Sequence, residues 1–514
     1  MKSDRSWVGT AVLIASILLL WEAAGHWRWV ADGTLPAPTA ILVRLFAERG
    51  EYWPHVLATL KISSLGFIIG NLVAVAAAVS FCLWPASERL MRGVNIAIFA
   101  VPPIAIVPVL VIALDADVAQ VTLAALLVYF PSMTATLAGL RDIDPRIADL
   151  VSAYGGGRTK MLLLVRFRAA LPAIMSGFQV AAPAAVLGAV LAEFGSGARW
   201  GLGTYLLGSL GRAEPDRLWG IGLTATAIAG IGYVLAALVA HITTGTNRSV
   251  TLIAPSRSRD AVQDNAVSRV AMGVAAILAP FLVWQALLVI AQLSPIIAKT
   301  PLGVIDYLFF SKFSAAAQVK ILAALAQTIP ITIIGMLIGL ATAFALALIS
   351  FAAPTIMRAL LPFALVTQTM PLVALTPLAV LIFGRGITVT LVITISVTFF
   401  AAFVVLAQGF ALIPRSAFDL VDSYGASTLQ KLRLVAIPAS RSWLFVAARL
   451  AMPKALLGVM IAEWLATGRG LGNLLNQSRG YLDYGMIWTV ALVSVLVAIA
   501  LYQLTNLLDR LTSR

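Results

Sequence analysis

Charged residues are scarce in this chain. Asp, Glu, Lys and Arg make up 11% of 514 residues, whereas 61% of the residues are hydrophobic and the mean hydropathy is +0.96. So few charges cannot cover the water-facing surface of a soluble protein of this length. The chain is therefore predicted to be an integral membrane protein. Twelve helices of roughly 20 residues would use close to half of it, which leaves loops but no room for a large soluble domain.

Cysteine and histidine are also rare. Cys82 is the only cysteine, which excludes an intrachain disulfide and a thiolate metal cluster. The three histidines, His26, His55 and His241, are too scattered to predict a metal site, and no cofactor is expected. The excess of 36 Lys and Arg over 22 Asp and Glu fits the positive-inside bias of cytoplasmic loops. Membrane lipid is therefore the expected surrounding, and no nucleic-acid partner is expected.

Apolar runs bounded by charges, Pro or Gly predict two sets of six spans. The first set lies near residues 7–24, 62–83, 93–114, 118–140, 174–194 and 218–243. The second set lies near residues 270–292, 325–350, 359–383, 387–412, 444–464 and 486–508. The first run mimics a secretory signal but is long enough to cross a bilayer, so it is interpreted as an uncleaved span.

A polar stretch separates the two sets and predicts the domain organisation. Residues 1–245 form the first six-span domain, 246–268 a cytoplasmic linker and 269–514 the second six-span domain. An even number of spans in each half places both termini and the linker on the same side of the membrane, and the distribution of Lys and Arg indicates that this side is the cytoplasm.

The second half repeats the first in register. The segment DLVSAYG at Asp149–Gly155 recurs as DLVDSYG at Asp419–Gly425. Because both halves start on the same side of the membrane, a pseudo-twofold axis along the membrane normal should relate them, with a central pathway at their interface. The predicted fold class is thus an all-α membrane protein with about 12 transmembrane helices in two pseudo-twofold-related six-helix halves.

The repeated loop lies on the predicted cytoplasmic side, where its glycine allows a tight bend between two short helices lying against the membrane. It resembles the cytoplasmic loop of the permease subunits of bacterial ATP-binding-cassette (ABC) importers, which has an acidic residue, a glycine and a later proline. The first copy has Arg168 where the family has the proline and a proline four residues later. The docking residues that the resemblance implies are Asp149, Tyr154, Gly155 and Pro172, and Asp419, Tyr424, Gly425 and Pro438.

Other segments, including Val101–Pro108 and Gly139–Arg146, resemble the branch that imports nitrate, sulfonates, taurine and pyrimidines. The resemblance implies a bacterial inner-membrane permease whose two loops dock two cytosolic ATP-binding subunits. A periplasmic or lipid-anchored binding protein would deliver a small solute. No Lys in the chain follows a Gly, so the chain lacks a phosphate-cradling G-x-x-x-x-G-K-[ST] loop. ATP hydrolysis must therefore occur on another chain, and this chain is not expected to be an enzyme.

Two other classes are possible. A secondary transporter driven by an ion gradient also commonly has twelve spans in two halves, but it usually needs several intramembrane carboxylates or histidines. Only Glu22, Glu193 and Glu463 qualify here. A membrane enzyme would need a cluster of nucleophile, base or metal ligands, and the sequence shows none.

Charges and prolines inside the predicted spans give the candidates for the pathway. Glu193 and Glu463 are each interpreted as a gate or substrate ligand or, preferably, as a structural carboxylate bonded to backbone amides. The prolines predict a kinked, pathway-lining span, with simple helix packing as the alternative. The cations Arg449 and Lys454 have no counterpart in the first half. Arg449 is near the cytoplasmic end of its span, whereas Lys454 is deeper and is expected to favour an anionic or zwitterionic substrate. The candidates are Pro102, Pro108, Pro371, Pro377, Gln179, Glu193, Glu463, Arg449 and Lys454.

Overall fold

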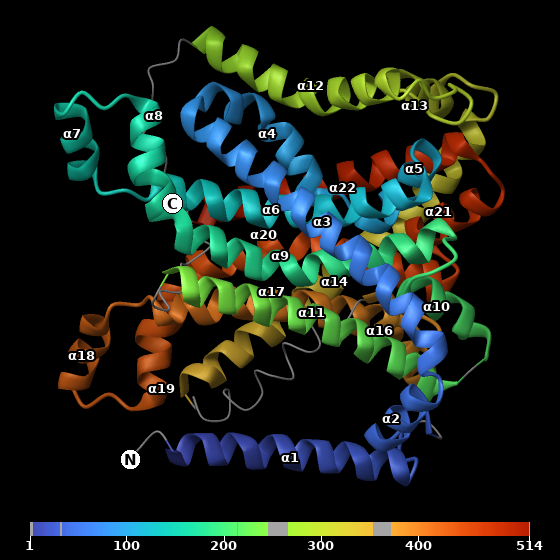
Figure 1. Cartoon of the computed structure of the whole chain (residues 1–514), viewed down its shortest axis with the longest axis horizontal. Coiled ribbons are helices and arrows are strands. Elements are labelled where there is room, and N and C mark those ends of the chain that lie inside the picture. Colours follow the sequence, from blue (N-terminus) through green and yellow to red (C-terminus); the bar gives the residue numbers. More distant parts are fainter. Residues whose placement is uncertain (1–3, 31–32, 213, 245–265, 353–371, 513–514) are drawn as a thin grey trace.

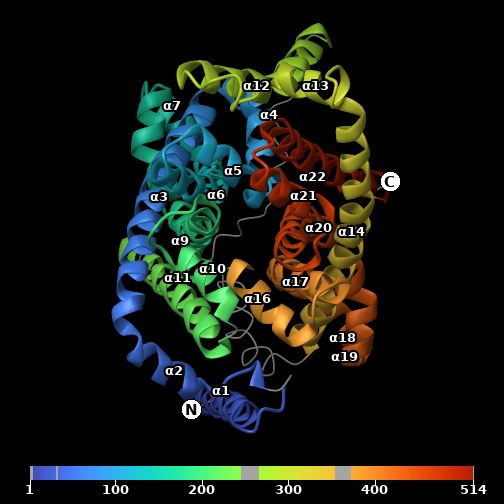
Figure 2. The same ribbon diagram turned by 90° about the vertical axis from the view of Figure 1, so that its right-hand side faces the viewer.

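The structure is a computed structural model that describes the chain apart from residues 1–3, 31–32, 213, 245–265, 353–371 and 513–514. Throughout this described part every regular element is a helix. The long helices run roughly along one common direction (Figure 1). Turned by 90°, the elements of the first half lie mostly opposite those of the second, and α12 and α13 cross one end of the molecule (Figure 2).

The helices recur in the same order in the two halves. In the first half, α8 continues through the π-helical turn Leu162–Arg166 into α9. The helices of that half are α1 (Asp4–His26), α2 (Pro38–Ala47), α3 (Arg49–Leu83), α4 (Pro85–Ala100), α5 (Pro103–Ala113), α6 (Ala116–Arg141), α7 (Pro145–Ala153), α8 (Arg158–Met161), α9 (Phe167–Ser196), α10 (Leu202–Ser209) and α11 (Pro215–Thr244).

In the second half, π-helical turns at Leu432–Ala436 and Glu463–Thr467 precede and follow α20. The helices are α12 (Ala266–Ile290), α13 (Pro301–Phe309), α14 (Ser314–Ala352), α16 (Leu372–Phe383), α17 (Ile387–Ala411), α18 (Arg415–Ser423), α19 (Thr428–Lys431), α20 (Ile437–Ala462), α21 (Gly470–Gly480) and α22 (Tyr484–Thr512). The predicted linker falls almost wholly outside the described residues, so the domain boundaries stay a prediction.

Contacts between the halves are reciprocal, as a pseudo-twofold axis requires. Helix α5 contacts α20, α21 and α22, and its counterpart α16 contacts α9, α10 and α11. The predicted arrangement of two related helical halves is therefore confirmed. Aromatic contacts repeat as well: the rings of Trp21 and Trp219 lie 5.6 Å apart in the first half, and those of Trp284 and Trp488 lie 5.2 Å apart in the second.

Small residues explain how the central helices approach each other. On α3, Gly66 and Gly70 face α6, where a Cβ atom at either glycine would collide with the α6 helix. The equivalent Gly335 and Gly339 on α14 face the threonines Thr394 and Thr398 of α17. Membrane helices lack a hydrophobic driving force against each other, so such small-residue contacts supply much of their packing.

The expected number of twelve spans needs correction for the described residues. Nine helices are long and apolar enough to cross a membrane, or up to ten if a bent pair counts as one span. The predicted span 93–114 is that pair: α4 and α5 meet at 104°. Pro102 and Pro103 cause the break, because neither has an N–H group to continue the hydrogen bonds of α4. The described apolar part of span 7–24 is short, and span 359–383 lies partly outside the described residues.

Candidate functional site: a central cavity and two paired loops

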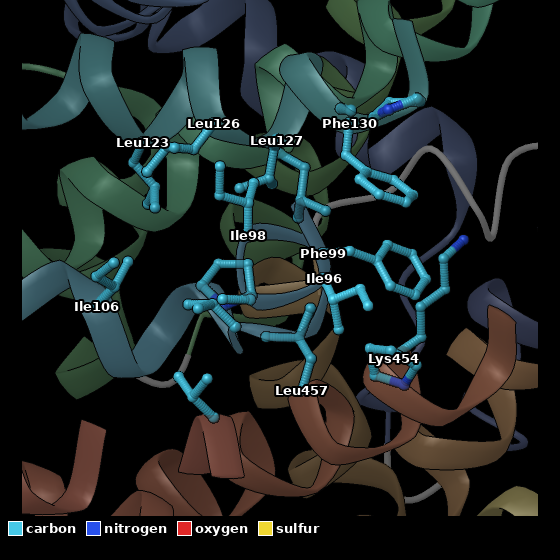
Figure 3. A pocket seen from close by; sticks show the side chains of 18 of the residues that line it. Ile96, Ile98, Phe99, Ile106, Leu123, Leu126, Leu127, Phe130, Lys454 and Leu457 are labelled. Atoms are coloured by element: carbon cyan, nitrogen blue, oxygen red, sulfur yellow. The ribbon is translucent and has the colours of Figure 1, made fainter. Parts of the chain in front are cut away.

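A cavity of about 2210 Å³ lies between the two halves. Helices α4, α5, α6, α9 and α11 line it from the first half, and α12, α16, α17, α20 and α22 line it from the second. Most lining side chains are aliphatic or aromatic, including Phe99 and Phe130, whose rings stack at 4.4 Å. Figure 3 shows these two rings near Lys454, which projects from α20. The chain thus encloses a large, mostly apolar space at the interface of its repeats.

The charges of the cavity all have one sign among the described lining residues: Arg92 and Lys454 are present, and Asp and Glu are absent. Gln179, from the first half, lines the same cavity. Two of the predicted pathway candidates, Gln179 and Lys454, are therefore brought together at one space. Their role in transport stays a prediction.

Glu193 and Glu463 do not line the cavity. They are 0% and 2% exposed, and each accepts a hydrogen bond of 2.9 Å from the amide of the second glycine in the Gly-Leu-Gly that follows it, Gly203 or Gly472. This glycine is required, since a Cβ on Gly203 would collide with the Val190 carbonyl. The arrangement is the one expected of a structural carboxylate, which the sequence favoured over a gate or substrate ligand.

Threonines from the neighbouring helices complete both carboxylate sites. Thr59 of α3 and Thr328 of α14 each accept a hydrogen bond of 2.9 Å from the leucine amide of the Gly-Leu-Gly turn. Thr328 also donates to Glu463 at 2.7 Å. Each site therefore joins three segments of its half. Thr59 and Thr328 occupy equivalent positions of the repeat, but only the placement of the helices shows that they reach the Gly-Leu-Gly turns.

Helices α5 and α16, which begin next to the paired prolines, both line the cavity, and the pathway role of the prolines stays a prediction. Pro102 produces the sharp bend between α4 and α5, but it, Pro108 and Pro377 are buried and do not line the cavity. Pro371 lies outside the described residues.

Arg449 also lies away from the cavity lining. Its guanidinium forms an ion pair of 2.7 Å with Asp509 of α22. This cation connects two helices of the second half, and a role of Arg449 in the pathway stays a prediction. Lys454, on the same helix, has no such carboxylate among its described neighbours.

The repeated loops project from one end of the molecule, where α7 and α18 extend beyond the long helices (Figure 1). Gly155 and Gly425 have φ of 71° and 73°, a left-handed conformation that glycine adopts without a steric penalty. The adjacent Tyr154 and Tyr424 are 85% and 86% exposed. Asp149 and Asp419 are exposed as well. The two loops therefore present the same side chains on the same backbone.

The second helix of each loop differs from the expected separate surface helix. α8 and α19 continue through π-helical turns into α9 and α20, so the loop is mechanically joined to a cavity-lining helix. Pro172 lies within α9 and lines the cavity, whereas Pro438 lies in the first turn of α20. The proline that the first loop lacks at the family position is thus replaced by one inside the helix.

A polar network at the opposite end of the first half was not predicted from the sequence. Arg217 is 4% exposed and donates to both oxygens of Glu48, at 2.8 Å and 2.6 Å. Burial alone would raise the pKa of Glu48, but the hydrogen bonds and charge of Arg217 hold this pKa below its ordinary value. Arg44 and Glu214 extend the network. Arg44 and Glu48 are close in the sequence, as are Glu214 and Arg217, but Glu48 and Arg217 are 169 residues apart.

A helical membrane protein with two repeated halves, a central cavity and a pair of matching exposed loops belongs by class to the membrane permeases. Comparison with known proteins specifies the family. The model of the "binding-protein-dependent transport system inner membrane component" matches twice, at residues 66–259 and 335–514. The chain therefore belongs to this family, whose members are transport permeases and not enzymes. It is a multi-pass inner-membrane protein and the permease component of an ABC importer.

Individual relatives agree with this assignment. The chain is similar to a "probable ABC transporter permease protein" of Haemophilus influenzae, with 27% identity over 209 residues, 40% of this chain and 85% of the relative. A riboflavin transport system permease protein of Chloroflexus aurantiacus is 32% identical over 30% of this chain and 59% of its own length. A formylaminopyrimidine transport permease protein of Halalkalibacterium halodurans is 29% identical over 36% of this chain and 75% of its own length. These shares make each relative about half as long as this chain.

Proposed function

We propose that this chain is a tandem fusion of two permease domains, 1–245 and 269–514, joined by the linker 246–268, and that it forms the complete translocation pathway of one importer. Relatives that are about half its length support the fusion. The cavity between the halves is the pathway, and a small solute of the kind that the relatives' names describe passes through it.

Two ATP-binding subunits dock on the loops from Asp149 to Pro172 and from Asp419 to Pro438. The observation that carries this proposal is that each loop exposes an equivalent tyrosine and continues directly into a cavity-lining helix. Closure of the subunits would move α9 and α20 relative to each other and change access to the cavity. Both termini and both loops then face the cytoplasm, and a periplasmic or lipid-anchored binding protein delivers the solute to the opposite end.

A glycine substitution with a matched control tests the docking. A Cβ on Gly155 meets nothing within 4 Å, but φ of 71° strains any other residue there. Gly157 of the same loop also has open space but an ordinary φ of −77°. Gly155→Val should therefore reduce ATP-driven uptake and coupled ATPase activity of the reconstituted transporter severalfold, and Gly157→Val should reduce both less.

The same experiment is made at Gly425→Val, with membrane abundance measured for every variant. Normal coupling in both Gly155→Val and Gly425→Val would contradict the docking assignment. Orientation is tested separately by fusing a reporter enzyme that is active only in the periplasm after Arg514. Activity of this reporter would contradict a cytoplasmic C-terminus.

A further inference from the structure

Lys454 is a cation of the cavity lining that has no charged or hydrogen-bonding partner among the residues that the structure describes. It lines the cavity, its side chain is partly exposed there, and it forms no ion pair or hydrogen bond with any described residue. Glu463, which lies nine residues further along the chain, is occupied by Thr328 and the Gly472 amide. An uncompensated cation at membrane depth is costly, so an isolated lysine there indicates a function.

The described lining of the cavity holds no carboxylate that could neutralise Lys454. Among described lining residues the only other charge is Arg92, which is also a cation. In the described lining, a ligand with a positive group would therefore meet two cations and no acceptor carboxylate, whereas an anionic group would find a charged donor.

The position is asymmetric. Gly177 through Pro183 of α9 correspond in the repeat to the residues before Lys454, and the equivalent of Lys454 itself is Ala184. Ala184 lines the same cavity from the first half. The cavity thus has one wall with a cation and an opposite wall without one, which suits a ligand that carries its charge at one end.

The remaining lining suits an apolar body. The stacked rings of Phe99 and Phe130 lie beside Lys454 in Figure 3, and Trp284 and Trp488 form a second stacked pair with their planes 6° apart. Flat aromatic surfaces of this kind favour aromatic ligands. The volume of the cavity accommodates molecules much larger than nitrate or taurine.

We propose that the cavity takes an amphipathic organic monoanion, with its carboxylate or sulfonate group at Lys454 and an aromatic body against the first-half rings, and that it discriminates against zwitterions. This inference rests on the proposed pathway and adds the class of substrate. The charged group would form a charge-assisted hydrogen bond with the Lys454 ammonium in an apolar setting, where such bonds are strong.

Two fluorescent probes with the same aromatic body test the charge requirement. Binding of 5-(dimethylamino)naphthalene-1-sulfonate, an anion, is compared with that of the neutral 5-(dimethylamino)naphthalene-1-sulfonamide. The full-length protein is placed in lipid nanodiscs with its ATP-binding subunits, and energy transfer from tryptophans such as Trp284 and Trp488 reports binding. The anion should bind at least about tenfold more tightly, and excess taurine should not displace it.

Variants assign that preference to one side chain. Lys454→Met should abolish the preference for the anion and leave binding of the sulfonamide unchanged, and Lys454→Arg should retain the preference. Arg449→Met removes a cation of the same helix outside the cavity and should retain it too. Equal binding of both probes by the wild-type protein, absent binding of the anion, an unchanged preference in Lys454→Met, or displacement by taurine would each overturn the proposal.

Failure of this inference is distinguishable from failure of the proposed function. Probe binding requires neither ATP nor the binding protein, whereas the proposed function is measured by ATPase coupling and its loss in the loop variants. A complex with coupled ATPase activity but no preference for the anion would reject the substrate class alone.

Discussion

The Thr328 hydroxyl donates a hydrogen bond of 2.7 Å to the carboxylate of Glu463, which follows 135 residues later in the chain. The same hydroxyl oxygen accepts the amide of Leu471. One threonine thus satisfies a buried acceptor and a buried donor at once.

Thr328→Val should therefore lower the stability of the protein. The substitution keeps the volume but leaves the Leu471 amide and one oxygen of Glu463 unpaired, at a cost of about 1–2 kcal/mol. Thermal unfolding in detergent should show a lower midpoint than that of Thr342→Val. Thr342 is an exposed residue of the same helix, and its hydroxyl donates a hydrogen bond to the Ile338 carbonyl one helical turn earlier. Equal midpoints of the two variants would show that the buried site is not stabilising.

The exposed tyrosines of the loops should contribute to binding of the ATP-binding subunits. Tyrosines at interfaces often account for about 2 kcal/mol or more when truncated. The double variant Tyr154→Ala and Tyr424→Ala should weaken copurification with the subunits by more than either single variant. Tyr481→Ala, an equally exposed tyrosine on the segment between α21 and α22, is the control. Undiminished copurification of the double variant would be evidence against docking at these residues.

Stability should depend on pH through Glu48. Its pKa in the folded protein lies below the ordinary value of 4.5, so ionised Glu48 stabilises the fold above that value, and this contribution is lost as the pH falls through the folded-state pKa. Arg217→Met breaks the buried pair and should cost about 3 kcal/mol at pH 7. The difference in unfolding midpoint from the wild type should then shrink below about pH 4. A difference that stays constant across this range would contradict the assignment.

Arg449 and Asp509 should be energetically coupled. Their side chains are 19% and 30% exposed, so the pair is partly protected from solvent and its coupling should be about 1 kcal/mol. A double-mutant cycle with Arg449→Met and Asp509→Asn, followed by thermal unfolding, measures this energy. Additive effects of the two substitutions would mean that the ion pair contributes nothing to stability.

Much of the fold could be predicted because duplication repeats its physical constraints. The carboxylates Glu193 and Glu463 are each followed by Gly-Leu-Gly, and a buried carboxylate near backbone amides in a tight turn has few alternatives. The depth of Lys454 followed from its place in an apolar run. Both inferences used local sequence and the register of the repeat.

The remaining features depend on which side of a helix faces which neighbour. Pro102 predicted a break, but neither its angle of 104° nor the burial of Pro108 follows from residue spacing in a helix that is apolar on all sides. The pairing of Glu48 with Arg217 bridges 169 residues and has no equivalent in the second half to reveal it. Such contacts are fixed only when the helices have been placed.

The difference between Lys454 on one wall of the cavity and Ala184 at the equivalent position of the other wall has an evolutionary consequence. In a permease assembled from two copies of one gene product, any substitution appears on both walls at once, so the choice is two lysines facing each other or none. Covalent joining of the copies frees each position to change alone. A duplicated and fused gene can therefore encode a cavity whose two walls differ, so that one wall binds the charged end of a solute and the other its uncharged end. A homodimer encoded by a single half-length gene cannot acquire this difference.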